Sequence, residues 1–388
     1  MVGFEYKGIM GASKKQKGHV PHLLEKEGQG VLPQAGIVGL IEGKKIAASA
    51  PIERGQVQPA SLDLRLGEKA YRLRAGFLPG SEGRVMERLE RLVYHELDLR
   101  NGAVLERGCV YLIPLAESLS LPSHISGLAN PKSSTGRLDI FTRLLTDYAG
   151  SFDSVRAGYH GGLYLEVSPQ SFTVRVKSGS RLSQLRLRCG EAKIFDDAEL
   201  LALHKRQRLV GDEPLIQNGL SLSVDLEGGE EQIIGYRALA HTNLIDVDRV
   251  GAYEVSDFWL PIKRPKEGGI VLSPDEFYIL ASREKLAIPS EYAAEMLPFN
   301  PLYGEFRVHY AGFFDPGFGV GKKGVPNARA VLEVRSREVP FVLEHGQRVG
   351  SLLFEKLTEK PKSVYGGAMK SHYQGQGLRL SKHFRQNN

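Results

Sequence analysis

A short polar segment, NPKSSTGRL at 130–138, gathers residue types that can hold a phosphate chain. It contains Lys132, the hydroxyl-bearing Ser133 and Ser134, and Arg137. Phosphate oxygens accept hydrogen bonds from cationic side chains, hydroxyl groups and backbone N–H groups. The segment is not a P-loop, which needs a Gly, four further residues and then Gly-Lys followed by Ser or Thr. It therefore predicts a phosphate-binding loop of another kind, with an ordinary polar turn as the alternative.

Two glutamates stand in otherwise apolar strand patterns. Glu166 lies in LYLEV (163–167), and Glu333 lies in RAVLEVR (329–335). Alternation places Glu166 on the face opposite Leu163, Leu165 and Val167, and Glu333 on the face opposite Ala330, Leu332 and Val334. Glutamate is depleted in strands, and a carboxyl group can act as a general acid and base. Either glutamate is thus a candidate proton carrier, although a salt-bridged surface residue is the commoner meaning of such a pattern.

A glycine-containing turn precedes each of these strands. FDSVRAGYHGG (152–162) carries Asp153 and Tyr159, and FDPGFGVGKKG (314–324) carries Asp315. Closely spaced glycines let a backbone approach a flat ligand, and an aromatic ring could stack on a base or sugar. The alternative interpretation is a pair of ordinary hairpin turns.

The C-terminal segment VYGGAMKSHYQGQGLRLSKHF (364–384) is rich in glycine, aromatic residues and basic residues. It has no clear period. Such a segment could be a disordered tail, or a lid that orders over an anionic ligand.

An internal repeat relates the two halves of the chain. Three pairs of segments share an offset of 167 residues: 103–122 with 270–289, 163–167 with 330–334, and 179–187 with 346–354. SLDLRLG (61–67) also matches SVDLEGG (223–229), at an offset of 162. The repeat predicts an extension over 1–30, a first domain over 31–200 and a second over 201–388. The inserted segment 230–268 has no assigned chemistry.

The elements around these candidates are mostly strands. Short period-two runs bounded by Gly, Ser and Pro predict strands in LDLRL, VYLIPLA, GLYLEV, FTVRVK and RLSQLRLR. Helix signals are confined to Pro33–Glu42 and Asp196–Leu209. The pattern predicts a mainly all-β chain with a sandwich or barrel in each half and a few short helices.

Composition narrows the class of protein. The 388 residues are 41% hydrophobic and 25% charged, which is typical of folded globular chains. Cys109 and Cys189 are too few for a disulfide framework, and no Cys-x-x-Cys pair of a zinc deaminase is present. No apolar run approaches the ~20 residues of a membrane helix, and no signal peptide is evident, so we expect a cytoplasmic protein. The net charge of +6 suits an anionic partner or merely a solvated basic surface.

Taken in order, four segments resemble the dCTP deaminase and dUTPase superfamily: QPASLDLRLG, NPKSSTGRL, AGYHGGLYLEV and GSRLSQLRL. The resemblance covers about 31–190 and recurs more weakly over about 210–388. YQGQG, near the C-terminus, is similar to the tail of the deaminases. The chain is identified on these motifs as a tandem-domain member of that superfamily.

The resemblance implies two dUTPase-like distorted β-barrels of the β-clip type, with nucleotide sites between neighbouring domains. It implies zinc-free chemistry in which a strand glutamate, here Glu166 or Glu333, shuttles protons. Ser133 and Arg137 would assist the attacking water, and Lys132 and Ser134 would contact the nucleotide. Mg²⁺ would accompany the triphosphate.

The two halves depart from the family pattern in different ways. The second half has NPLYGEF (300–306) where the first has the Ser pair and Arg. The resemblance also assigns nucleotide contacts to Asp153, Tyr159 and Asp315, and to three residues of the tail: Tyr365, His372 and Gln376. The family usually has Lys at the place of His372 and Arg at that of Lys132. We expect sites that combine the first half's loop with the second half's turn and tail, in an assembly of three chains and six domains.

Four functions remain open on the sequence. The first is deamination of dCTP to dUTP and ammonia. The second is hydrolysis of dUTP, or a bifunctional reaction from dCTP to dUMP, which Asp153 keeps open. The third is a non-catalytic nucleotide-binding module. Nucleic-acid binding is the weakest, because no basic and aromatic stripe of a recognised module is present. The strand glutamates favour deamination.

Overall fold

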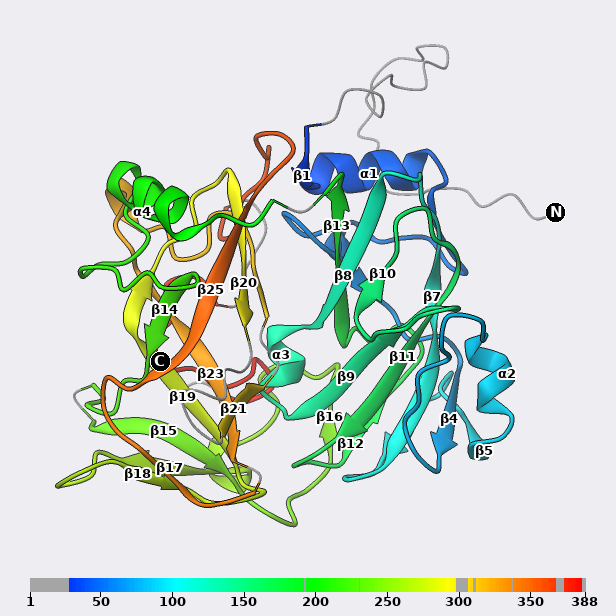
Figure 1. Cartoon of the computed structure of the whole chain (residues 1–388). Helices are drawn as coiled ribbons and strands as arrows, with labels where there is room; N and C mark the ends of the chain where they lie inside the picture. The colour runs from blue at the N-terminus through cyan, green and yellow to red at the C-terminus, as the bar shows by residue number, and fades with distance from the viewer. Residues whose placement is uncertain are drawn as a thin grey trace.

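The computed structural model of the chain describes residues 28–191, 193–229, 231–297, 306–309, 312–336, 338–367 and 373–385. Within these residues the backbone is mainly β, as the sequence predicts. Each half folds around two larger sheets, and the two halves lie side by side (Figure 1).

The first half contains a sheet of order β1-β13-β8-β10, with β3 paired to β13, and a sheet of order β5-β4-β7-β11-β9, with β2 paired to β7. These strands are β1 Gly30–Val31, β2 Ile46–Ala48, β3 Leu62–Leu64, β4 Lys69–Leu73, β5 Val93–Asp98, β7 Val110–Ser120, β8 Ile125–Pro131, β9 Ile140–Leu145, β10 Ser154–Val155, β11 His160–Pro169 and β13 Ser183–Cys189.

The second half repeats this plan with the orders β14-β25-β20-β22 and β17-β15-β19-β23-β21. Its strands are β14 Leu220–Ser223, β15 Ile233–Ala238, β17 Trp259–Lys263, β19 Phe277–Leu286, β20 Tyr292–Leu297, β21 Phe306–His309, β22 Phe313–Phe314, β23 Ala328–Ser336 and β25 Arg348–Lys356. Two small sheets, β16-β12-β6 and β18-β24, comprise β6 Ala103–Leu105, β12 Val174–Val176, β16 Ile245–Asp246, β18 Ile270–Leu272 and β24 Phe341–Leu343.

Strand register confirms the repeat at an offset of 167. Leu165 pairs with Ile113 in the first half, and Leu332 pairs with Leu280 in the second. The offset of 162 for the segment 61–67 is wrong, however. Leu66 bridges Leu115 and Val224 bridges Ser282, so 61–67 corresponds to 219–225. The sequence match slipped by four residues because both stretches carry similar apolar alternation.

Helices are few and short in the described part of the chain: α1 Gln34–Glu42, α2 Val85–Leu89, α3 Ser133–Gly136, α4 Asp197–Arg206 and the 3₁₀ turns Arg54–Gln56, Val255–Asp257 and Lys322–Gly324. The predicted helices over 33–42 and 196–209 are confirmed as α1 and α4. Asp196 caps α4 by accepting a hydrogen bond from the Glu199 amide at 2.8 Å. None of the described helices combines the length and apolarity needed to span a bilayer.

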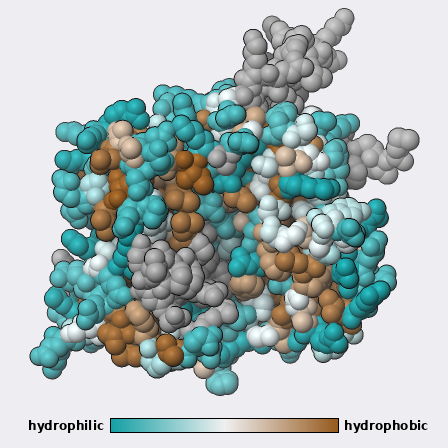
Figure 2. Space-filling model, in the orientation of Figure 1, coloured by the Kyte–Doolittle hydropathy of each residue, from teal (hydrophilic) through white to brown (hydrophobic). Residues whose placement is uncertain are grey.

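Each half has its own apolar core, and a third core joins the halves. In the third core Trp259 lies edge-on to Phe172 of the first half and to Phe384 near the C-terminus, with ring centroids 5.3 and 5.9 Å apart. The connection between β15 and β17, which contains β16, therefore packs between the halves, as does the C-terminal segment. On the face that Figure 2 shows, hydrophilic and hydrophobic groups are interspersed.

Candidate active site

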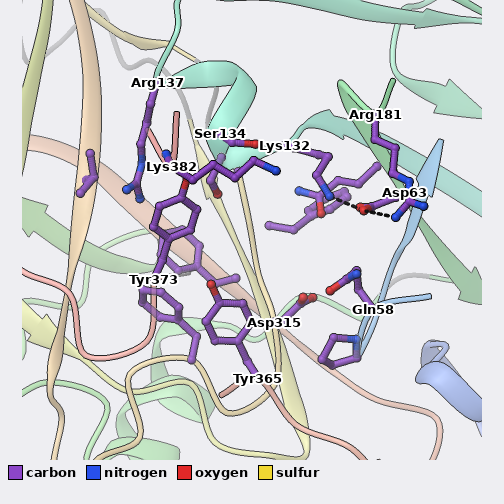
Figure 3. A pocket seen from close by; sticks show the side chains of 18 of the residues that line it. Gln58, Asp63, Lys132, Ser134, Arg137, Arg181, Asp315, Tyr365, Tyr373 and Lys382 are labelled. Atoms are coloured by element: carbon purple, nitrogen blue, oxygen red, sulfur yellow. Dashed lines mark hydrogen bonds and ion pairs between the residues drawn. The ribbon is translucent and has the colours of Figure 1, made fainter. Parts of the chain in front are cut away.

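A cavity of about 510 Å³ lies between the halves, and Figure 3 shows side chains that line it. The first half contributes α3 and its flanking residues, together with residues of β3 and β13. The second half contributes Glu333 of β23, Asp315 after β22 and residues of the C-terminal segment. The cavity therefore combines the predicted loop of one half with the predicted turn and tail of the other.

The loop at 130–138 is held in place by backbone contacts. It forms the single turn α3, and Lys132, Ser133, Ser134 and Arg137 all line the cavity. The Ser381 hydroxyl of the C-terminal segment donates a 2.8 Å hydrogen bond to the Ser134 carbonyl. The C-terminal segment thus contacts the loop through its backbone, and both serines of the loop line the cavity.

Glu333 and Arg137 face each other across the junction of the halves. Their Oε1 and Nε atoms are 3.9 Å apart, and both side chains are almost completely buried. Burial raises the pKa of the Glu333 carboxyl to about 8, while the Arg137 guanidinium acts in the opposite direction. At neutral pH this carboxyl group is mostly protonated, so it can donate a proton to a bound ligand and take it back.

The C-terminal segment surrounds the Arg137 guanidinium. Nη2 donates to Gln376 Oε1 and Nη1 to the Arg379 carbonyl, each at 3.1 Å. The guanidinium carbon also lies 4.0 Å from the centroid of the Tyr373 ring. These contacts leave Nε buried without a hydrogen-bond partner in the described structure and directed at Glu333.

Asp315 provides a second carboxyl group in the cavity. Burial raises its pKa to about 6, with the cation of Arg186 lowering it in part. Asp315 Oδ1 is buried without a hydrogen-bond partner in the described structure and lies 3.8 Å from Arg186 Nη2. An unpaired buried acceptor of this kind is costly unless a ligand donor reaches it. Nearby, the rings of Tyr365 and Phe318 pack with their centroids 5.6 Å apart.

Three cations gather at the end of the cavity near β3: Lys132, Arg181 and Lys382 (Figure 3). Lys132 Nζ contacts Asp63 Oδ2, and Arg181 Nη1 lies 4.0 Å from the same oxygen. Burial lowers the pKa of the Lys382 ammonium, and the nearby Lys132 lowers it further. Three cations against the carboxylates of Asp63 and Asp248 leave this end suited to a polyanion.

Both halves of the chain match known protein families. Residues 28–191 match the family model of the 2′-deoxycytidine 5′-triphosphate deaminase (DCD) N-terminal domain, and 196–384 match that of the C-terminal domain. The chain belongs to the dCTP deaminase family. A crystal structure of 2′-deoxycytidine 5′-triphosphate deaminase from Agrobacterium tumefaciens is 55% identical with a TM-score of 0.82, over 85% of this chain and 99% of that one. The fold is therefore the dUTPase-like β fold of that enzyme, and the match extends over both halves.

Curated relatives are more distant. The dCTP deaminase of Haloarcula marismortui is 29% identical over 49% of this chain and 94% of its own length. A protein of Kocuria rhizophila named "dCTP deaminase, dUMP-forming" is 34% identical, over 27% of this chain and 53% of its own length.

In the first half, the counterpart of Glu333 is Glu166 on β11, which we call closed because it is covered and kept out of the cavity. Glu166 is buried, but it does not line the cavity. Gly76 lies against it so closely that a β-carbon there would be 2.4 Å from Glu166 Oε2. Burial raises the pKa of Glu166, and the Phe77 backbone amide acts in the opposite direction. The sequence left both glutamates as candidate proton carriers. Of the two, only Glu333 lines the cavity.

Asp153 and Tyr159 also lie outside the cavity, contrary to their predicted positions at a ligand. Asp153 pairs with Arg143 at 2.6 Å and accepts from the Leu144 amide at 2.8 Å. Tyr159 is buried, and its hydroxyl donates to the Gly162 carbonyl at 2.7 Å. Both side chains therefore have their partners within the first half, away from the cavity.

Register explains why Asp153 is not the counterpart of Asp315. Val155 pairs with Gly127 and Phe314 with Ala294, two positions 167 residues apart. The residue after each is Arg156 in the first half and Asp315 in the second. The longer first turn shifted the apparent match, so that the first half has a cation where the second has the carboxyl group.

Several cavity residues were not singled out from the sequence, although they lie in quoted motifs. Asp63 lies in SLDLRLG, Arg181 in GSRLSQLRL and Lys382 in the C-terminal segment. A charged residue inside an alternating strand pattern is the signal that could have found Asp63. Tyr365 and Gln376 line the cavity as predicted, whereas His372 lies outside the described residues.

Proposed function

We propose that the chain catalyses the hydrolytic deamination of dCTP to dUTP and ammonia in this cavity. Glu333 would be the proton carrier, with Arg137 and Ser133 as its partners from the first half. The observation that carries the proposal is the buried Glu333 carboxyl, with its pKa of about 8, facing Arg137 in a cavity that has a cationic end.

The reaction needs two proton deliveries, and one carboxyl group can make both. Protonated Glu333 would donate to N3 of cytosine, and the resulting carboxylate would take a proton from the water that adds to C4. That proton would pass to N4, the C4–N4 bond would break, and ammonia would leave. The proton of the new C4 hydroxyl would return to Glu333, which leaves the carbonyl of uracil and restores the acid. Arg137 would stabilise the carboxylate between the transfers.

Binding follows from the charges that line the cavity. The triphosphate would lie at Lys132, Arg181 and Lys382, with the Ser134 hydroxyl as a further donor. Asp315 would accept a hydrogen bond from the deoxyribose hydroxyl, which would satisfy its unpaired oxygen. Tyr365 and Gln376 would hold the nucleotide from the C-terminal side.

Mg²⁺ is proposed to accompany the triphosphate. Asp63 and Asp248 line the cationic end, and Asp63 Oδ1 is buried without a hydrogen-bond partner in the described structure. A carboxylate beside a phosphate chain suits Mg²⁺, which is usually bound by one or two carboxylates, water and substrate phosphates. The ion would neutralise part of the phosphate charge. Among the described residues no cluster of three His, Cys, Asp or Glu side chains could hold a metal by itself.

A second candidate reaction continues from dUTP to dUMP, because several curated relatives are named dUMP-forming. Against it, Asp153, the residue that kept this reaction open, is paired with Arg143 outside the cavity. Product analysis separates the candidates. Protein incubated with dCTP and Mg²⁺ should release ammonia and dUTP in equal amounts. Accumulation of dUMP and pyrophosphate would favour the second reaction, and no turnover of either nucleotide would favour a binding module.

Assembly into three chains with six domains also remains a proposal. Residues of both halves come together around the cavity within one chain. Light scattering after size-exclusion chromatography would test the assembly by comparing the measured mass with three times 42.8 kDa.

A further inference from the structure

We infer that Asp139 and Arg335 are a positioning pair for the deamination, fixing the distance between Arg137 and Glu333. This inference rests on the proposed function. Neither residue lines the cavity, so neither is a candidate for contact with the nucleotide.

The pair joins the two segments that carry the reacting groups. Arg335 lies two residues after Glu333 on β23, and Asp139 lies two residues after Arg137. On β23, Glu333 and Arg335 share a face and are ~6.6–6.8 Å apart along the strand. The ion pair therefore joins the halves two residues away from each reacting group. Arg335 Nη2 forms an ion pair with Asp139 Oδ2.

Further hydrogen bonds fix both partners. The Ser171 hydroxyl donates to Asp139 Oδ2 at 2.5 Å, and Arg335 Nη1 donates to the Asp275 carbonyl at 2.5 Å. The Asp139 side chain is 1% exposed and that of Arg335 is 9% exposed. Asp139 also has a left-handed backbone with φ of 55°, an uncommon conformation for a residue other than glycine, where the chain leaves α3 for β9.

Stability alone is a weak reason for such a pair. Taking two charges out of water costs free energy that their attraction only roughly offsets, and apolar residues of similar volume often serve equally well. A fixed geometry is a stronger reason here. The Arg137 side chain donates hydrogen bonds to Gln376 and to the Arg379 carbonyl, which belong to the C-terminal segment. The Asp139–Arg335 pair adds a direct ion pair between the segment that follows the Arg137 loop and the strand of Glu333.

The halves differ at these positions. The counterpart of Arg335 at the offset of 167 is Ser168, so the strand of Glu166 lacks the cation. The tie thus occurs on the strand whose glutamate lines the cavity and not on the strand whose glutamate is closed.

The test is a double-mutant cycle with Asp139→Asn, Arg335→Gln and both together, using dCTP and Mg²⁺. Glu355→Gln and Arg188→Gln are the matched controls, because Arg188 and Glu355 form another buried ion pair between the halves that does not line the cavity. For each variant kcat, KM and the melting temperature are measured. Arg335→Lys, which keeps the charge but loses the planar fork, is included in case Arg335→Gln does not fold.

A misplacement of about 1 Å can lower a rate by about 10²-fold, so we expect each single variant to lower kcat by about 10–100-fold with KM changed by less than about threefold. The double variant should be no slower than the slower single variant, because the two residues act as a unit. Arg335→Lys should lower kcat by a smaller factor, and the controls should lose melting temperature while kcat stays within about twofold of wild type.

Wild-type kcat in folded Asp139 or Arg335 variants would overturn the inference, as would equal losses of kcat in the controls. Both results leave the proposed function intact, since wild-type protein would still turn over dCTP. Absence of turnover by wild-type protein would instead overturn the proposed function and this inference with it.

Discussion

The two halves use the same position of the repeat in opposite ways. In the first half, the connection between β4 and β5 carries α2 and brings Gly76 onto the half's own Glu166. In the second half, the connection between β15 and β17 carries β16, which pairs with β12 of the first half. That second connection also places Val247 and Asp248 in the cavity. The connection in the first half thus covers Glu166. The connection in the second half contributes residues to the cavity that Glu333 lines.

This difference explains how a duplicated fold can have fewer sites than domains. The first half keeps the phosphate loop, and the second keeps the open glutamate and Asp315. Between the halves, Arg188 and Glu355 stand at equivalent positions of the repeat and form an ion pair with each other. A pair of identical halves would place like charges together there. Charge therefore favours pairing of one half with the other.

The largest expected effect separates the two glutamates. Glu333→Gln should lower kcat for dCTP by about 10²–10⁴-fold, because it removes a general acid and base. Glu166→Gln should leave kcat within about twofold of wild type, because Glu166 is covered by Gly76. Steady-state ammonia release measures both, with circular dichroism to check folding. Equal losses in the two variants would mean that both halves react.

The second prediction concerns pH and the Arg137–Glu333 contact. Activity should fall as pH rises through about 8, because the raised pKa of Glu333 means that its carboxyl group then loses the proton it donates. Arg137→Gln should lower kcat by about 10–100-fold and move this fall to higher pH, since the Arg137 charge lowers that pKa. The profile of kcat/KM from pH 6 to 10 tests it. A profile that stays in place would contradict the contact.

Much of this site follows from the sequence. Lys132, Ser133, Ser134 and Arg137 are recognisable because charges and hydroxyl groups are concentrated in a short stretch, and Glu333 and Asp315 stand in segments of the repeat. The sequence does not show that Glu166 is covered by Gly76, because this depends on where the connection after β4 folds back. Whether Asp153 corresponds to Asp315 was open for a similar reason, since strand register is needed to show which residues of the two turns are equivalent.

A third, smaller effect tests the turn before each glutamate strand. Asp315→Asn should raise KM for dCTP by about tenfold with a smaller change in kcat, because a hydrogen bond to a charged acceptor is worth about 1.5–3 kcal/mol. Asp153→Asn, its apparent match in sequence, should leave KM unchanged and lower the melting temperature, because Asp153 pairs with Arg143. An effect of Asp153→Asn on KM would contradict this account, because it would show that the first turn contributes to nucleotide binding.

A fourth prediction concerns stability. Burial of Glu333 raises its pKa from about 4.5 to about 8, so native protein holds a proton that the unfolded chain releases between these pH values. Wild-type stability should therefore decline from pH 4.5 to 8 through this group. Glu333→Gln removes the titrating carboxyl group, so this decline should be absent from the variant. Its melting temperature should exceed that of wild type by a margin that grows up to about pH 8. Differential scanning calorimetry at pH 5 and 8 checks the sign.

The smallest effect on activity is expected in the closed half. Gly76→Ala should lower the melting temperature, because its β-carbon would meet the Glu166 carboxyl group at 2.4 Å. The value of kcat should stay within about twofold of wild type, as expected for a site away from the reaction. A loss of activity larger than the loss of folded protein would show that the closed half contributes to turnover.

The central claim is that each chain forms one nucleotide site from its two halves. Calorimetric titration of the folded Glu333→Gln variant with dCTP and Mg²⁺ tests it most directly, because the expected loss of turnover lets binding be counted. The account predicts one nucleotide per chain, and no measurable binding when Arg181→Ala and Lys132→Ala are added. Two nucleotides per chain would contradict it, because the closed first half would then also bind.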